Sequence, residues 1–546
     1  MRRPLYRLPT ETLVQIVQDV LYPSRSKDRT LESFWLPRIP DSTSLIPVSR
    51  SCRRLRNVAL SRPEWWTHLS SRNVSSIPTF LSRSNDKPLT MLIESSYVSR
   101  RHAIHYTNQL VRLREVHFLS IDHACMEPFN APLQMTHKSL EKLTLCASDP
   151  TNDRWKTHRV YIDSGHFPRL QHLVIHGMAF RVPAQQGIPT LTHLVLSRIH
   201  VRLLCHRVTE LIAFSPLLEN LVLSRLVTEQ ETELVVVNPP PLLHLRRIYF
   251  HDLCFADLRF FLKVTARTAG EAAVQVVNDD VNCSQYNLPL IFKRRMPEGA
   301  EALQLSATSS AGSQLHQFAI TATNSTHAVR VGTRSDHIYV PRLCEPGIWF
   351  EPFLADTRIM SSVRELWLFG AYLNHADWLT YFGVSPKLVF GALPNLQSIV
   401  IVTVNSSEQS TLHPPDLYPL PDIVEDPSVD RSQLKKLRLV HCVAPDRQMD
   451  DSLIGDEVIE IYTKRLKLSR MLDQLASGGY SYFKELVLQI TPDVGLDPVE
   501  EERLLEYFET VTIEEIFGPP QMPLPRCCVD EDDGPGGSCT WTAPLY

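Results

Sequence analysis

The feature that most constrains the fold is a short apolar phrase that the chain repeats at near-regular intervals. The stretch "IPTLTHLVLSRIHV" begins at Ile188, and "SPLLENLVLSRLVT" begins 27 residues later at Ser215. Written as L-x-x-L-x-L, with any large apolar residue allowed, the phrase begins at Leu113, Leu140, Leu170, Leu191, Leu218, Leu245, Val363, Leu396, Leu434 and Phe483, with a weaker copy at Ala300. The first intervals are 27, 30, 21, 27 and 27 residues. A series at such an interval indicates a repeat architecture.

The alternation within the phrase predicts a strand with one buried face. Residues four and six of a copy, such as Leu194 and Leu196, share one face of a strand, while residues three, five and seven share the other. Parallel stacking of such strands would bury the leucine face, so we predict a core that includes Leu173, Leu194, Leu196, Leu221 and Leu223. Some copies carry proline two residues before the first Leu, where its fixed φ and missing N–H suit an extended segment outside the ladder. These prolines are Pro168, Pro189, Pro216 and Pro394.

Interval and phrase together resemble those of the leucine-rich-repeat family over about residues 113–490. The resemblance implies an α/β solenoid with a curved parallel sheet, which we place at 111–515. The ninth place of the phrase departs from the family pattern. The family usually has Asn or Cys there, but apart from Cys442 the copies mostly have apolar residues. These apolar residues are Ile121, Met178, Ile199, Leu226, Leu253 and Val404. Later intervals of 33, 38 and 49 residues predict inserted loops, so we expect an irregular solenoid with insertions at about 256–356 and 405–431.

A different pattern precedes the repeats and predicts short helices. In "LPTETLVQIVQDVL", Leu13, Ile16 and Val17 recur at helical spacing behind Pro9, a residue tolerated in a first helical turn. A second apolar face follows in "SLIPVSRSCRRLRNVALSRPEWWTHL". Its members are Val48, Cys52, Leu55, Val58 and Ala59, with arginines on or near the opposite face.

The ordered set of L-P-x-E-x-L, Cys-Arg-Arg, Ala-Leu-x-x-Pro and then Trp before Leu resembles an F-box over residues 5–71. The stretch 22–43 separates the two helices by more than a compact F-box has. The resemblance implies binding to a Skp-type adaptor and, through it, to a cullin-RING ubiquitin ligase. The residues implied are Leu8, Pro9, Leu13, Ile16, Val48, Leu55, Val58 and Trp65. The alternative is a helical cap over the open end of the repeats, which repeat arrays need for solubility. Residues 72–110 would then be a linker or further capping segment.

Composition narrows the class of partner. A formal net charge of -4 and a pI near 6.6 supply no basic field for a polyanion, so we expect no nucleic acid and no membrane as partner. No apolar run approaches the ~20 residues that span a bilayer. The 11 cysteines lack paired metal-ligand spacing, and we expect reduced thiols in a cytoplasmic and/or nuclear protein. Residues 516–546 are predicted to be a disordered tail.

Binding residues are expected on the face opposite the leucines. From places three, five and seven we select His172, His176, His193, Arg247, Tyr249, His251, Trp367 and Phe369 as substrate-binding candidates. Tyr, Trp and Arg are frequent anchors of binding energy. The alternative for Trp367 and Phe369 is that inserted segments fold over their strand and make it core. His172 and His193 fall on adjacent strands, but no carboxylate or thiol stands at the matching place, so we expect no metal.

Motif searches favour a binding protein over an enzyme. The chain has no G-x-S-x-G, G-x-x-x-x-G-K-[ST], H-E-x-x-H, G-x-G-x-x-G or C-x-x-C, so we expect no catalytic residues and no cofactor. The two resemblances together imply a substrate-recognition subunit of an SCF-type ubiquitin ligase that binds an unknown protein substrate. The alternative is a leucine-rich-repeat scaffold or regulatory binding protein outside any ligase.

Overall fold

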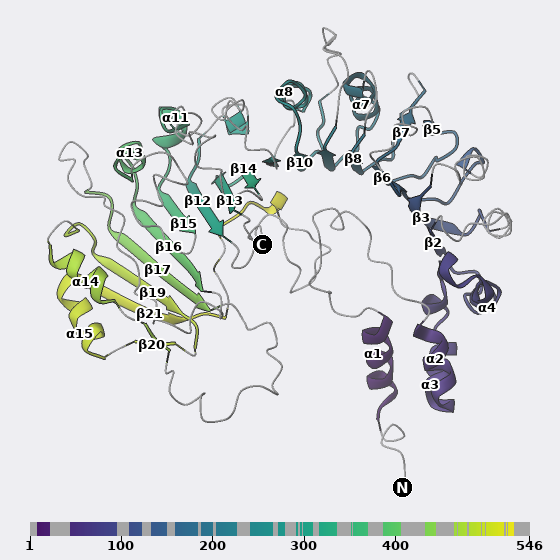
Figure 1. The fold of residues 1–546 in the computed structure, drawn as a ribbon, viewed down its shortest axis with the longest axis horizontal. Coiled ribbons are helices and arrows are strands. Elements are labelled where there is room, and N and C mark those ends of the chain that lie inside the picture. Colours follow the sequence, from purple (N-terminus) through teal and green to yellow (C-terminus); the bar gives the residue numbers. More distant parts are fainter. Residues whose placement is uncertain are drawn as a thin grey trace. The chain divides into compact units, whose positions relative to one another are not determined.

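The protein is a mixed α/β structure with a large, mostly parallel sheet and helices (Figure 1). The computed structural model describes residues 8–21, 44–94, 109–122, 133–149, 159–183, 187–199, 204–226, 241–265, 271–278, 291–292, 295–296, 299–309, 316–335, 351, 353–369, 386–405, 432–443, 464–466, 468–477, 480–492, 494–496, 498–517, 520 and 522–528. Two compact units divide the chain. The first unit is Met1–Leu245 with Ala256–Ala269, and the second unit is Arg246–Phe255 with Gly270–Tyr546.

The first unit opens with the N-terminal helical module, which consists of α1 (Thr10–Leu21), α2 (Leu45–Ser51), α3 (Arg53–Leu60) and the 3-10 turn η4 (Pro63–Trp66). Helix α1 packs against α2 and α3 through Leu13, Val17 and Leu21, which are four residues apart and therefore share one helix face. The indole Nε1 of Trp66 donates to the Ala59 carbonyl at 2.8 Å and ties η4 to α3.

The repeated phrase forms most strands of the first unit's sheet, and the first two strands precede its first copy. In sheet order the strands are β1 (His68–Ser70), β2 (Leu89–Glu94), β3 (Leu113–Ile121), β4 (Lys142–Ala147), β6 (His172–His176), β8 (His193–Ser197) and β9 (Asn220–Ser224), all parallel. The leucines at places four and six are buried, as the alternation predicts. The connections hold η5 (Ser71–Ser76), α4 (Ile77–Arg83), α7 (Leu204–Ala213), α8 (Phe255–Val264) and the small ribbon β5 (Arg159–Tyr161) with β7 (Ala179–Arg181).

The prolines before the phrase stand in turns, not in the extended segment that we expected. The Leu170 N–H donates to the Phe167 carbonyl at 3.3 Å, and the Leu191 N–H donates to the Ile188 carbonyl at 3.0 Å. Each of these hydrogen bonds closes a four-residue turn with proline second, the place where a φ near -60° is required. Proline therefore fixes the turn that leads into the strand.

At the end of the strand, the eighth place of the phrase turns the chain inward. Gly177, Arg198 and Arg225, which directly follow β6, β8 and β9, and Ser120, next to the last residue of β3, have positive φ between 47° and 71°. This left-handed residue ends the extended backbone and directs the ninth residue into the core. The ninth residues Ile121, Met178, Ile199 and Leu226 are buried. The absence of Asn at the ninth place in these copies therefore has a physical reason, since an apolar side chain fills the core there.

The second unit has longer strands and a reversed pair. In sheet order its strands are β10 (Arg247–His251), β11 (Ala272–Asn278), β14 (His327–Ser335), β13 (His316–Thr323), β12 (Ala302–Ser309), β15 (Glu365–Phe369), β16 (Ser398–Asn405), β17 (Lys436–Val443), β19 (Glu485–Ile490) and β21 (Thr510–Glu515). Strand β13 runs antiparallel to both neighbours. The β13–β14 hairpin turns at Asn324, whose Oδ1 accepts the N–H groups of Thr326 and His327 at 3.0 and 2.7 Å.

Helices of the second unit lie along one side of its sheet (Figure 1). They are α11 (Thr357–Met360), α13 (Pro386–Gly391), α14 (Ser469–Ala476) and α15 (Pro498–Tyr507), and β18 (Lys464–Leu466) pairs with β20 (Val494–Leu496) apart from the main sheet. Two parallel strands need a long connection that returns the chain to the starting edge of the sheet, and helices occupy such connections here.

Several segment assignments from the sequence differ from the structure. The span 256–356, expected as an inserted loop, holds α8 and the strands β11 to β14. The span 72–110, expected as linker or cap, contributes β2 to the sheet. Except for Asn405, the second expected insertion, 405–431, lies outside the described residues.

The C-terminal region also differs from the disordered tail expected at 516–546. Met522, Cys527 and Cys528 are buried, and Arg526–Cys528 forms the 3-10 turn η12. The reason is the apolar content of Met522–Cys528, which the acidic and glycine-rich residues beyond it obscured at the sequence level. Residues 529–546 lie outside the described part of the chain.

Candidate protein-binding surfaces

The residues predicted to bind an adaptor divide into two groups in the N-terminal helical module. Leu13, Val58 and Trp65 are buried and hold the module together. The others reach the surface to different extents, with Pro9 and Ile16 exposed and Leu8, Val48 and Leu55 half-buried. The Arg54 guanidinium donates to the Leu8 carbonyl, so the segment before α1 is fixed against α3. The eight predicted residues therefore do not form one open stripe.

The apolar face of α1 has an exposed edge that is better placed for a partner. Ile16 and Val20 lie on this edge, next to the buried Leu13 and Val17, and are 39% and 42% exposed. Leu60, at the end of α3, is 43% exposed. Helix α1 is thus apolar on more of its circumference than its packing on α2 and α3 uses.

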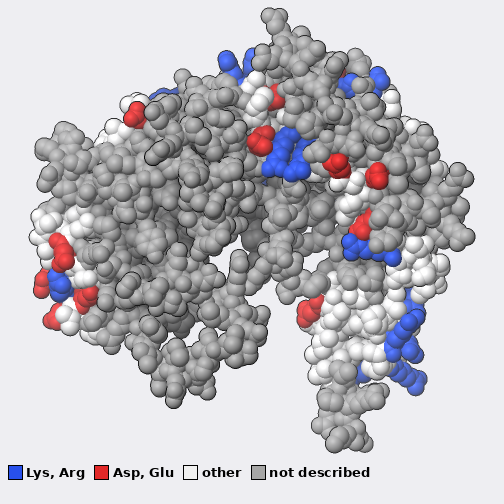
Figure 2. Space-filling view, viewed as in Figure 1, with Lys and Arg blue, Asp and Glu red and all other residues white. Residues whose placement is uncertain are grey.

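Exposed arginines accompany these helices. Figure 2 shows Lys and Arg side chains gathered along one side of the N-terminal helical module. They include Arg50, Arg53, Arg56 and Arg62, all exposed. The Arg56 Nε donates to the Ser49 carbonyl at 2.9 Å, and Arg62 lies 3.5 Å from a carboxylate oxygen of Glu64. The surface formed by α2 and α3 is therefore basic, although the whole chain is slightly acidic.

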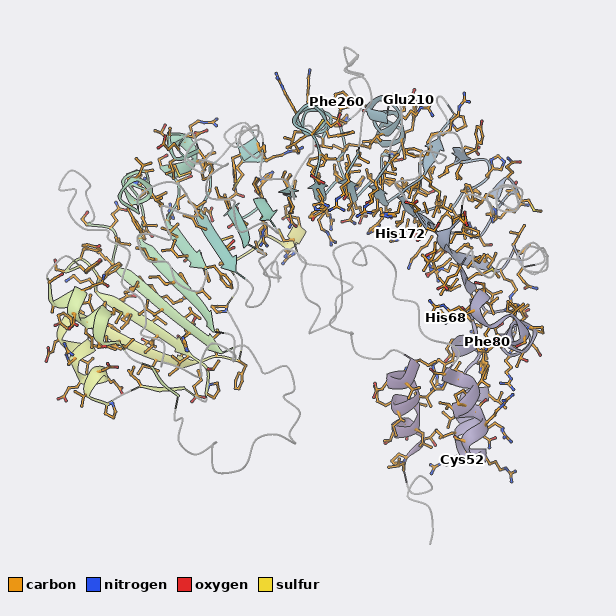
Figure 3. The ribbon with its side chains drawn as sticks, viewed as in Figure 1. Cys52, His68, Phe80, His172, Glu210 and Phe260 are labelled. Carbon is orange, nitrogen blue, oxygen red and sulfur yellow. The ribbon has the colours of Figure 1, made fainter. Side chains whose placement is uncertain are left out.

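On the sheet of the first unit, the strand register aligns polar side chains in a row that we call the third-place row. It consists of His68, Thr90, Glu115, Lys142, His172, His193 and Asn220, each paired with the next across adjacent strands. In Figure 3 His172 lies on the side of the strands opposite α7, which carries Glu210. The sequence singled out His172, His176 and His193 from this face, and the structure adds their register with Glu115 and Lys142.

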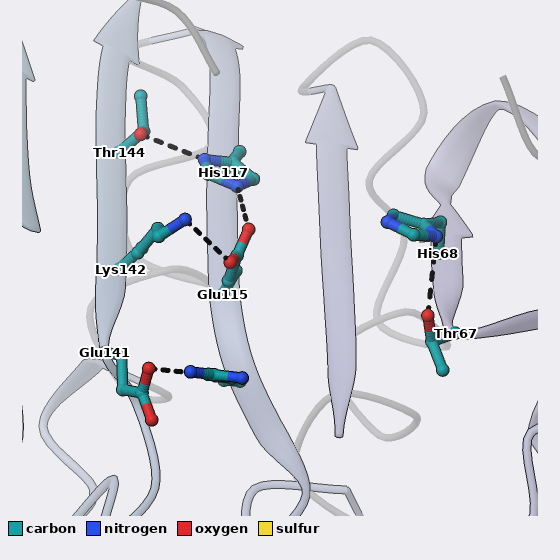
Figure 4. Close-up of polar contacts among 8 residues, drawn as sticks. Thr67, His68, Glu115, His117, Glu141, Lys142 and Thr144 are labelled. Carbon is teal, nitrogen blue, oxygen red and sulfur yellow. Dashed lines mark hydrogen bonds and ion pairs between the residues drawn. The ribbon is translucent and has the colours of Figure 1, made fainter. Parts of the chain in front are cut away.

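An ion pair stands in the middle of the row (Figure 4). A carboxylate oxygen of Glu115 lies 3.0 Å from Lys142 Nζ. His117 Nε2 is 3.7 Å from the other oxygen, too long for a hydrogen bond, while its Nδ1 is 2.9 Å from Thr144 Oγ1. Burial by itself would raise the pKa of Glu115, but His117 and Lys142 outweigh it and lower the pKa to about 2. Glu115 is therefore a carboxylate at neutral pH.

The neighbouring histidine of β1 is neutral. Burial lowers the pKa of His68 to about 4, against a smaller opposing effect from Glu115. Its Nδ1 lies 3.4 Å from Thr67 Oγ1. The charges on this part of the face therefore cancel, and it presents hydrogen-bonding groups without a net field.

Further along the row, two imidazole rings stack. The centroids of His172 and His193 are 4.0 Å apart, with 12° between the ring planes. His193 Nε2 is 2.6 Å from Asn220 Nδ2, and its Nδ1 is 2.8 Å from Thr192 Oγ1. Because both nitrogens of His193 have partners, its orientation is fixed. Among the described residues, no group of three or more His, Cys, Asp or Glu side chains is placed to hold a metal ion.

The predicted substrate-binding residues of the second unit are less accessible. Arg247 and Tyr249 on β10 are half-buried, and His251 is buried. Trp367 and Phe369 on β15 are only 1% and 7% exposed, contrary to the prediction that this face is open. Met522 packs against both aromatic side chains, with Leu524 and Ile516 beside it. The covering residues come from the C-terminal end of the chain, whereas the alternative from the sequence had placed them in an inserted segment.

Sequence reasoning missed Glu115, Lys142, His117 and Thr144, although the signal was present. They stand at places three and five of the copies that begin at Leu113 and Leu140, the same places that selected the histidines. The preference for aromatic and arginine anchors excluded them. Charge complementarity between places in consecutive copies would have found the pair.

Comparisons with known proteins add no family assignment. No protein-family model matches the chain, and no curated protein matches it. Within the described part of the chain, no helix combines the length and apolar character that crossing a membrane requires.

Proposed function

We propose that the chain is a substrate-recognition subunit of an SCF-type ubiquitin ligase, with no active site of its own. In this proposal the N-terminal helical module binds a Skp-type adaptor, which connects it to a cullin, and the sheet face binds a protein substrate. The observation that carries the proposal is the exposed edge of the apolar face of α1, where Ile16 and Val20 lie in solvent beside the buried Leu13 and Val17. The F-box resemblance over residues 5–71 supplies the identity of the partner.

The physical case for a partner helix or groove rests on the exposed apolar area. An amphipathic helix that keeps apolar residues at i and i+4 in solvent gains free energy when a partner covers them. The exposed arginines of α2 and α3 in the same module favour a partner with carboxylates, since complementary charge speeds encounter and fixes orientation. We therefore expect adaptor binding to weaken as salt concentration rises.

The substrate surface that we propose is the third-place row of the first unit, with Arg247 and Tyr249 of the second unit as separate candidates. The row offers Lys142, Glu115 and His193 as oriented hydrogen-bonding groups. Valines stand two places further along the strands, at Val174 and Val195, and both are half-buried. A polar row beside apolar positions suits a protein surface, whose contacts mix hydrogen bonds and apolar area.

The adaptor assignment is tested with Ile16→Asp combined with Val20→Asp in the full chain. Charged residues at these exposed sites should abolish co-purification of the Skp-type adaptor and cullin from cells while thermal unfolding stays near that of the wild type. Gln18→Asp adds a carboxylate on an exposed side of the same helix and serves as the matched control. Retained adaptor in the double variant contradicts the proposed surface. A wild-type chain that captures no adaptor favours the scaffold or regulatory protein instead.

The substrate assignment is tested by proximity labelling with the full chain. His172→Ala with His193→Ala should remove labelled substrates while adaptor binding persists, and so should Arg247→Ala with Tyr249→Ala if the second unit contributes. Arg169→Ala, in the exposed turn before β6, is the control. An unchanged set of labelled proteins in both double variants, with folding intact, removes these surfaces from substrate recognition.

A further inference from the structure

The C-terminal segment, residues Met522–Cys528, crosses the sheet of the second unit from one side toward the other. Met522 packs with side chains from β12, β15, β16 and β17, namely Ala302, Trp367, Phe369, Val400, Val402, Val440 and Cys442. Cys527 and Cys528 pack with Ala273 of β11 and Ala328 of β14, and Leu524 contacts both clusters. The segment therefore runs across the strands and adds no strand to the sheet.

Side-chain burial, not backbone pairing, holds this segment in place. The Thr323 hydroxyl donates to the Pro523 carbonyl at 3.4 Å, and the Cys527 thiol donates to the Thr326 carbonyl at 3.7 Å, both long contacts. Pro520, Pro523 and Pro525 have no N–H to satisfy, and proline favours an extended backbone without internal hydrogen bonds. Peptide ligands rich in proline use these properties to dock on aromatic-lined grooves.

A polar group stands next to the cluster on which Met522 packs. Arg438 of β17 lies between Val400 and Val487 in the strand register, and Val440 follows two residues later on the same face. Its side chain is half-buried, its Nε is fully buried, and no hydrogen bond or ion pair joins it to the described residues. A guanidinium with an unpaired buried N–H is stabilised strongly by a carboxylate, which it can hold with two parallel hydrogen bonds.

We propose that this face is a docking groove for an extended, proline-spaced apolar peptide of a partner protein, with a carboxylate for Arg438, and that the C-terminal segment occupies the groove in cis. The groove does not depend on the ligase assignment. Met522 marks the apolar anchor, since it shares one buried cluster with Trp367, and a partner peptide would carry a carboxylate next to the apolar anchor that replaces Met522. The partner class is thus a disordered segment of acidic-apolar-proline character.

A tethered segment competes strongly with any free peptide. A short flexible linker holds its ligand at an effective concentration of about millimolar, so an incoming peptide meets a groove that is open only part of the time. The apparent affinity falls by the fraction of chains with an open groove. Release of the segment should therefore raise peptide affinity at least about tenfold.

The buried cysteines provide a direct readout of the segment's position. Cys527 and Cys528 of the segment are buried. Cys254 is exposed and Cys146 is buried in the first unit, so one alkylation experiment contains a fast and a slow reference cysteine. A hydrogen bond with Cys528 lowers the pKa of Cys527, against burial and the charge of Glu271, which raise it. The alkylation rates of Cys527 and Cys528, set against that of the exposed Cys254, therefore report how far the segment shields its thiols.

The test uses the full wild-type chain and a synthetic peptide, PPEMPLPR, which is the sequence of residues 519–526 with Glu in place of Gln521. Alkylation of Cys527 and Cys528 by a maleimide is followed by mass spectrometry as the peptide is raised to millimolar concentration. We expect a saturable rise in both rates, with Cys146 unchanged and Cys254 fast throughout. Cysteines of the segment that react as fast as Cys254 without peptide would show that the segment does not occupy the groove, and would overturn the proposal.

A second arm measures peptide binding directly by fluorescence anisotropy. Met522→Asp with Leu524→Asp should release the segment and tighten peptide binding at least about tenfold over the wild type. Arg526→Asp, at an exposed position of the segment, should leave it unchanged. Arg438→Gln added to the released variant should remove the preference for PPEMPLPR over PPQMPLPR. Absence of binding to the released variant, together with unchanged alkylation in the wild type, rejects the groove.

Discussion

The face of the sheet opposite the leucines is partly open in the first unit and covered in the second. Its third places are polar in both units, for example Glu115 and Lys142 in the first and Lys436 and Glu485 in the second. At the fifth place, however, β15 and β16 carry the buried Trp367 and Val400, where β6 and β8 carry the half-buried Val174 and Val195. Leucine-type residues at places four and six are buried in both. The phrase therefore constrains only the core face. The opposite face is free to become a hydrogen-bonding surface or a second layer of core.

The largest expected effect is a difference in the stability lost when a fifth-place side chain is truncated in each unit. Trp367→Ala should destabilise the protein by about 3–5 kcal/mol, because it opens a cavity under Met522. Val195→Ala stands at the matching fifth place of the first unit, where the side chain is half-buried, and should cost about 1 kcal/mol or less. Chemical denaturation of both variants checks the difference. Equal losses would mean that the first unit's face is also core.

Acid should affect the first unit through the third-place row. The pKa of His68 is lowered from 6.5 to about 4, so the unfolded state binds the proton first and stability falls between pH 6.5 and 4. The pKa of Glu115 is lowered from 4.5 to about 2, so its contribution is lost between pH 4.5 and 2. Each contribution is about 1–3 kcal/mol at most. Thermal unfolding measured against pH checks this prediction. In His68→Gln the melting temperature should change less between pH 6.5 and 4, and in Glu115→Gln it should change less between pH 4.5 and 2.

The second unit provides the control for this prediction. Lys436 and Glu485 occupy third places on β17 and β19, with 3.7 Å between their charged atoms. Both side chains are more exposed than Glu115, so solvent screens the pair and Glu485→Gln should change stability by less than about 0.5 kcal/mol. An acid effect in Glu485→Gln as large as that in Glu115→Gln would refute the distinction between the two faces.

The smallest effect concerns where the strands end. In β8 the eighth place of the phrase, Arg198, has a φ of 51°, whereas in β16 the strand continues through the eighth place, Thr403. Glycine relieves the left-handed strain but weakens an extended strand. Arg198→Gly should therefore raise stability by up to about 1 kcal/mol, and Thr403→Gly should lower it by about 0.5–1 kcal/mol. Opposite shifts in melting temperature check the pair, and shifts of the same sign would count against the strand-end difference.

The repeated phrase predicted most of the parallel strands and their buried faces. Even the weak copy at Ala300 begins a strand two residues later, at Ala302. The phrase could not reveal β11 or β21, since "AAVQVVN" and "TVTIEE" lack its leucine spacing. It also missed the β13–β14 hairpin, because an antiparallel pair needs no crossover and leaves the repeat interval unmarked.

Whether the face opposite the leucines is exposed or covered was harder to predict than the strands themselves. Places three and five identify the residues that share this face, but they contain no information about which distant segment covers it. Met522 reaches Trp367 from far along the chain, and such a contact leaves no periodic signal. In the first unit the candidate row was predictable in position, whereas the pairing of Glu115 with Lys142 depended on register between strands.

The hairpin of β13 and β14 has a consequence for the order of folding. A repeat array ordinarily grows by adding each new strand to the one before it. Here β11 pairs with β14, which is synthesised after β12 and β13, while β12 pairs with β13 and β15. As the chain leaves the ribosome, the second unit therefore cannot extend its sheet past β11 until His316–Ser335 has been synthesised and has paired with itself. Assembly on the ribosome should pause at β11, with the incomplete sheet edge open to chaperones.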